Sequence, residues 1–97
     1  DAQVYKKANL TRQHFSKIRN NPAYVPSKMT VLALAVALEL NVEQTQNLLS
    51  RAGYILSKSL KADLIVEYFL QRKYYDIYRI NEALFYYGQP LLGARVN

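Results

Sequence analysis

The sequence contains no cysteine, one histidine, and only three glycines and three prolines among 97 residues. Without cysteine, the chain can form neither a disulfide nor a thiolate metal site. Its longest apolar run, residues 31–38, has eight residues, whereas a bilayer-spanning helix needs about 20. No stretch has the pattern of a secretory signal peptide. We therefore expect a cytoplasmic protein without a membrane segment.

The residues needed for common catalytic chemistry are also missing. His14 is the only histidine, so neither a zinc site nor a Ser–His–acid triad is expected. There is no glycine-rich phosphate loop. Asp63 and Glu67 lie four residues apart, a spacing typical of a solvated helix face. We predict that the chain is not an enzyme, with no catalytic residue, no metal ligand and no cofactor.

The charge is distributed unevenly along the chain. Residues 1–28 carry six basic side chains against one acidic, which nets +5. Residues 29–97 carry seven basic against six acidic, which nets +1. A basic end of this kind is expected where a protein faces a polyanion, although a surface adapted for solubility is the alternative explanation.

The apolar content of 51% and the periodicity predict one domain of the all-α class, a compact multi-helix bundle. The predicted helices are a short one containing Val4 and Ala8, one over 12–20, one over 28–40, one from Val42 to a stop at Gly53, one opened by Ser57 or Ser59, and one from Asp76 to Gly88. Thr11, Ser27 and Asp76 are the expected N-caps, Asp1 could cap the first helix, and Asn9 suits its left-handed end. No alternating strand pattern is present.

The helix predicted over 12–20 has two distinct faces. At about 100° per residue, Phe15 and Ile18 fall together, with His14 beside them. The opposite arc carries Arg12, Gln13, Ser16, Lys17 and Asn20. These side chains have donors and acceptors suited to base edges and phosphates, but any surface helix has a polar outer arc.

Residues 4–49 resemble the lambda-repressor-like, or Xre-type, helix-turn-helix family. VYKKANLTRQHFSKIRNN is similar to that family's second and third helices, and VPSKMTVLALAVALELNVEQTQNLL to its fourth and fifth. The resemblance implies a DNA-binding module of a bacterial or phage regulatory protein, which reads duplex DNA through the helix at 12–20. It places Arg12, Gln13 and Lys17 against base edges or phosphates, with His14 at the margin of the groove. Ser16, on the same arc, is a further candidate DNA-binding residue. Arg19, Asn20, Asn21 and Lys28 would bracket the phosphate backbone.

Residues 1–52 would then form a helix-turn-helix core that lacks the family's usual first helix, and residues 53–97 a C-terminal helical extension packed on it. The extension is similar to the tail of Xre-like domains in some bacterial multidomain proteins, including ones with a macro domain. Useful DNA affinity requires either a homodimer or a preceding domain in a longer chain, because one short helix makes few contacts.

A different class of function stays open, namely a protein-interaction or oligomerisation module on the same scaffold, attached to an upstream catalytic or effector domain. Asp1 would repel a phosphate, and Tyr5 stands where the family has a small alanine. Seven of the nine tyrosines lie in the extension, where they serve either as packed amphipathic residues or as a partner surface. Stacking of single-stranded bases is a further alternative, which the sparse basic residues there disfavour.

Overall fold

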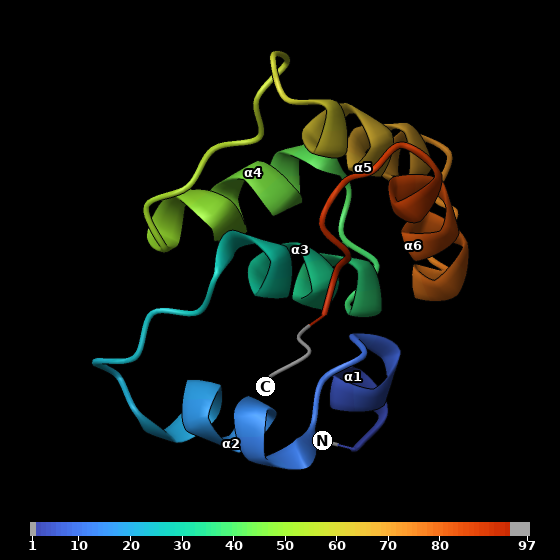
Figure 1. Ribbon diagram of the computed structural model, residues 1–97. Coiled ribbons are helices and arrows are strands. Elements are labelled where there is room, and N and C mark those ends of the chain that lie inside the picture. The colour runs from blue at the N-terminus through green and yellow to red at the C-terminus, as the bar shows by residue number, and fades with distance from the viewer. Residues whose placement is uncertain (1, 94–97) are drawn as a thin grey trace.

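Six α-helices follow one another in the part of the chain that the computed structural model describes, residues 2–93, and this part contains no strand (Figure 1). The helices are α1 (Ala2–Lys7), α2 (Arg12–Asn20), α3 (Lys28–Ala37), α4 (Val42–Arg51), α5 (Lys61–Gln71) and α6 (Ile77–Tyr86). The all-α prediction is therefore confirmed for the described residues. The radius of gyration, 12.4 Å, matches the roughly 12.5 Å expected of a compact domain of this length.

Helix α3 occupies the centre of the molecule, and Figure 1 shows α1 and α2 on one side of it and α4 and α5 on the other. It packs against α1, α4 and α6. Seven of its ten residues are buried, as its nearly all-round apolar sequence requires. Leu32 and Val36 are fully buried and anchor the contacts with the surrounding helices.

Three helices begin at the N-caps predicted from the sequence. The Thr11 side chain accepts the N–H of His14, that of Ser27 accepts the N–H of Thr30, and Asp76 caps α6. The start of α5 was predicted wrongly: neither Ser57 nor Ser59 caps it. Its N-cap is Leu60, which makes no side-chain capping bond. The predicted cap at Asp1 lies outside the described residues.

Five helices end in the same way, with one residue in the left-handed conformation. The residues are Asn9, Glu39, Gly53, Lys73 and Gly88, with φ between 55° and 85°. In each case the next N–H bonds a carbonyl five residues earlier, as Leu10 does with Tyr5 and Leu40 with Ala35. This is the Schellman ending. It closes α3 at Ala37, three residues earlier than the sequence predicts.

The segment after α6 returns across α3 to the turn between α1 and α2 (Figure 1). Leu92 is fully buried in the core there. Its N–H donates to Asn81 Oδ1 at 2.7 Å, and its carbonyl accepts from Asn81 Nδ2 at 3.1 Å and Asn9 Nδ2 at 3.5 Å. The end of the extension therefore holds the turn that precedes α2.

Two carboxylates predicted to lie on a solvated face are buried instead. Asp63 is 1% exposed and Glu67 8%. Asp63 Oδ2 accepts from Lys28 Nζ at 2.6 Å and from the N–H of Ser57 at 2.7 Å. Glu67 Oε2 accepts from Lys58 Nζ at 2.9 Å. These partners neutralise the buried charges, so the pair joins α5 to α3 and to the loop before α5.

Two tyrosines of the extension pack against the first half of the chain. The hydroxyl of Tyr54 donates to the Pro26 carbonyl at 2.8 Å, and that of Tyr75 to the Leu40 carbonyl at 3.0 Å. Five others are about half exposed or more, namely Tyr68, Tyr74, Tyr78, Tyr86 and Tyr87. Two tyrosines of the extension therefore contribute to packing, and five are in contact with solvent.

Candidate nucleic-acid interface

Helix α2 is attached to the body of the molecule through one edge. None of its residues is fully buried, although Phe15 and Ile18 are half-buried and pack against the core. The ring of Phe15 lies 5.8 Å from that of Tyr5 on α1, so an aromatic contact joins the two helices. This light attachment leaves most of the circumference of α2 open.

The open face of α2 carries most of the side chains predicted to form the site. Six of the seven site residues predicted on α2 are exposed, namely Arg12, Gln13, Ser16, Lys17, Arg19 and Asn20, and the seventh, His14, is partly buried. Asn20 Nδ2 donates to Ser16 Oγ at 3.1 Å, and the guanidinium of Arg19 lies 5.8 Å from the Phe15 ring centroid. The structure therefore brings these residues together on one helix and presents them to solvent.

His14, Lys17 and Tyr24 form a small cluster beside this face. His14 Nε2 is hydrogen-bonded to the Tyr24 hydroxyl at 3.0 Å, and Lys17 Nζ lies 5.2 Å from the Tyr24 ring centroid. With Thr11 and Gln13 they line a hollow of about 220 Å³. Tyr24 was not among the predicted site residues. Its position between Pro22 and Pro26 gives no periodic signal, although its contact with α2 makes it part of the same surface.

Two predicted phosphate contacts have structural roles instead of standing free. Lys28 is ion-paired with Asp63 and its side chain is 19% exposed, so its ammonium group is engaged within the fold. Asn21 ends α2, where its side chain accepts the N–H of Ala23. That Asx turn fits a residue before proline, which disfavours helical backbone.

The exposed charged side chains of α1 and α2 are all basic. Residues 2–28 contain no acidic side chain. Lys6 and Lys7 on α1 are exposed, as are Arg12, Lys17 and Arg19 on α2, and none of the five forms an ion pair with an acidic residue of the described region. Unpaired cations that gather on one surface raise the local concentration of anions.

The environment of His14 lowers its pKa below the ordinary value of 6.5, first through burial and then through the neighbouring Lys17 ammonium. The unfolded chain therefore takes up a proton at a pH where folded His14 stays neutral. Folded His14 therefore destabilises the protein only when the unfolded chain can be protonated. The free energy of unfolding keeps its full value above about pH 6.5 and decreases progressively as the pH falls below that value.

We expect the urea midpoint of unfolding to fall between about pH 7 and pH 5.5, and the fall to be smaller in His14→Gln. Denaturation followed by circular dichroism at each pH measures both. An equal fall in the two proteins would show that other groups cause it.

The described part of the chain holds no group of three or more His, Cys, Asp or Glu side chains that could bind a metal ion. None of its helices is long and apolar enough to cross a membrane. Comparison with protein-family models, with curated proteins and with solved structures finds no match to this chain. The geometry and charge of the surface around α2 are therefore the basis for assigning a function.

Proposed function

We propose that this domain binds double-stranded DNA, with α2 in the major groove. The observation that carries the proposal is the surface of α1 and α2, where five exposed basic side chains stand without a described acidic partner. Phosphates are the polyanion that such a surface attracts, and each neutralised phosphate adds affinity through counterion release.

The shape of α2 supports the same proposal. With its side chains an α-helix is about 10–12 Å in diameter, and the major groove, about 12 Å wide, admits one. Helix α2 has nine residues. Arg12, Gln13 and Lys17 lie on the solvent side of the helix. Arginine and lysine suit guanine edges, glutamine suits adenine edges, and all three can also contact phosphates. The resemblance of residues 4–49 to lambda-repressor-like helix-turn-helix domains implies the same role for this helix.

Some residues have supporting roles in this proposal. Tyr24 holds His14 through a hydrogen bond and faces Lys17, so it limits the positions that the Lys17 ammonium can take. Lys28 is left out of the DNA contacts because Asp63 binds it. Lys6 and Lys7 on α1 take its place as candidates for the phosphate backbone.

A salt titration tests the proposal. We expect affinity for a random-sequence duplex to fall by about 10³-fold between about 50 and 200 mM salt if six phosphates are contacted. Fluorescence anisotropy with a labelled duplex measures it. Absence of binding at low salt would rule out the DNA function.

The double variant Arg12→Ala/Lys17→Ala tests the role of α2. We expect weaker binding and a plot of log K against log salt that is shallower by about 2, because two phosphate-reaching cations are removed. Thermal stability should barely change, since both side chains are exposed. Lys61→Ala/Arg72→Ala removes the same charge from α5 and its C-cap and serves as the control. If DNA affinity falls by the same factor in the two variants, the overall charge of the protein governs binding and α2 does not.

A further inference from the structure

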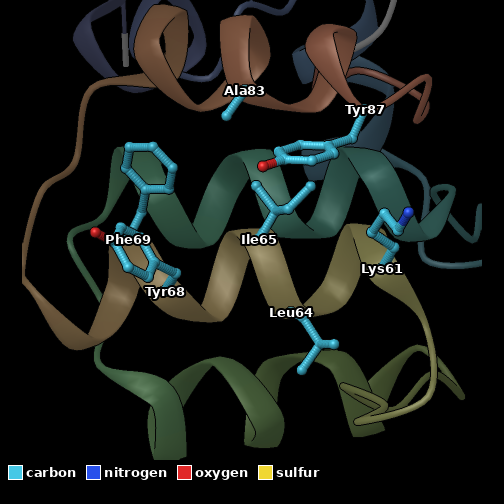
Figure 2. A pocket seen from close by; sticks show the side chains of 7 residues that line it. All are labelled: Lys61, Leu64, Ile65, Tyr68, Phe69, Ala83 and Tyr87. Carbon is cyan, nitrogen blue, oxygen red and sulfur yellow. The ribbon is translucent and has the colours of Figure 1, made fainter.

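A second surface feature, separate from α2, is a groove between α5 and α6. It has a volume of about 540 Å³ and is lined mainly by apolar and aromatic side chains, namely Leu64, Ile65, Tyr68 and Phe69 of α5 with Ala83 of α6 and Tyr87 after it. Figure 2 shows Ile65 and Phe69 pointing up from α5 toward α6, and Ala83 pointing down between them. The Tyr87 ring extends across the space above Ile65 (Figure 2). The two helices are therefore in contact without filling the space between them.

Several large apolar side chains at the rim of this groove are exposed to solvent. Leu64 is 45% exposed, and Tyr68 and Tyr87 are each 52% exposed. Tyr86 is also exposed, and its ring lies 4.9 Å from that of Tyr87. Exposed apolar side chains that gather around a groove mark an interaction site in many soluble proteins.

A cation stands at each end of the α5 side of the groove. Lys61 is the first residue of α5, and its Nζ lies 5.7 Å from the Tyr87 ring centroid. Arg72 is the C-cap, and its guanidinium carbon lies 3.5 Å from the Tyr68 ring centroid. The eleven-residue separation places their Cα positions about 16 Å apart along the helix axis.

No acidic side chain offsets these cations within the described surface. The groove lining contains none. The carboxylates of α5 are engaged with Lys28 and Lys58, and Glu82 of α6 is paired with Arg79. The groove therefore combines an apolar floor with positive charge at both ends.

We propose that the α5–α6 groove binds an acidic amphipathic helix of another protein. Apolar side chains at positions i, i+4 and i+7 of that helix would fill the space above Ile65, Phe69 and Ala83. Acidic side chains about three turns apart would meet Lys61 and Arg72, which already lie against aromatic rings. A second copy of this chain fits less well, because its net charge is +6 and it would bring its own cations to the interface.

The occupancy of the groove does not depend on DNA binding by α2. The probe is a labelled, alanine-rich synthetic peptide of about 15 residues, long enough to form a marginally stable helix, with leucines at i, i+4 and i+7 spacing and two glutamates about three turns apart. We expect saturable binding by fluorescence anisotropy, and no binding of the matched peptide in which lysine replaces glutamate. Equal binding of both peptides would overturn the proposal, as would failure of the acidic peptide to bind.

Two variants locate the site. Lys61→Ala/Arg72→Ala should weaken binding of the acidic peptide about fivefold through the loss of two charge pairs, while Arg12→Ala/Lys17→Ala, which removes equal charge, should leave it unchanged. Ala83→Leu should block the groove without altering charge, and circular dichroism checks that it folds. Unchanged peptide binding in Ala83→Leu would exclude the groove. A dimer by sedimentation that Ala83→Leu dissociates would overturn the proposed occupant, because a second copy of the chain would then fill the groove. Because DNA affinity is measured on the same variants, either proposal can fail while the other holds.

Discussion

Replacing Asp63 with alanine is expected to lower the free energy of unfolding by about 3 kcal/mol, which corresponds to roughly 15 °C in melting temperature for a domain of this size. Asp63 is 1% exposed and accepts both from Lys28 Nζ and from the N–H of Ser57. Its removal leaves a largely buried ammonium group and a backbone donor without their acceptor. The loss is at the lower end of the range for broken buried ion pairs, because the Lys28 side chain is 19% exposed.

Urea denaturation followed by circular dichroism measures this effect, and Glu82→Ala provides the matched comparison. The Arg79–Glu82 pair is 61% and 70% exposed, so its loss should leave the urea midpoint almost unchanged. The double variant Lys28→Met/Asp63→Leu should recover part of the loss, because it removes both charges and keeps apolar volume. Similar losses in Asp63→Ala and Glu82→Ala would mean that the buried pair does not hold α5 against α3.

Local signals in the sequence were sufficient for most helix boundaries. Thr11, Ser27 and Asp76 cap their helices as predicted because a cap needs only a side chain and the N–H groups two or three residues later. Gly53 and Gly88 end theirs for a similar local reason. Helix α3 shows the limit, because its end requires Glu39 in a left-handed conformation, which glutamate rarely favours.

Long-range partners could not be predicted in the same way. Asp63 and Glu67 have the spacing of a solvated pair, and only the approach of Lys28, 35 residues away along the chain, shows that Asp63 is buried. Tyr24 was missed because its contacts with His14 and Lys17 cross a proline-containing loop. Such contacts follow from tertiary packing, and no periodicity encodes them.

The two candidate surfaces differ in how far the sequence reveals them. The polar face of α2 follows from the wheel positions of Phe15 and Ile18, and its exposure matches that expectation. The groove does not follow from the pattern of α5, because Ile65 and Phe69 resemble ordinary core residues. Only the packing of α6 beside α5 shows that these two side chains line an open groove.

Gly93→Ala is expected to be the second strongly destabilising change, again by about 3 kcal/mol. Gly93 has φ of +82°, and a Cβ added there would lie 2.7 Å from the Ala8 carbonyl oxygen and from Asn9 Cβ. Left-handed backbone costs a non-glycine residue about 1–2 kcal/mol, and overpacking against fixed neighbours adds about 1–3 kcal/mol. The neighbours cannot move easily, because Asn9 forms the turn before α2 and Leu92 is fully buried beside it.

Gly88→Ala separates the two contributions to this loss. Gly88 also has positive φ, +68°, but a Cβ there meets no atom within 4 Å, so only the backbone cost of about 1 kcal/mol applies. Urea denaturation of both variants should therefore show a loss about 2 kcal/mol larger for Gly93→Ala. Because the clash is with the turn that positions α2, Gly93→Ala should also weaken DNA binding under conditions where it remains folded, whereas Gly88→Ala should not. Equal losses of stability in Gly93→Ala and Gly88→Ala would mean that the segment after α6 is not tightly packed against the turn before α2. Phe15 and Ile18 would then position α2 without it.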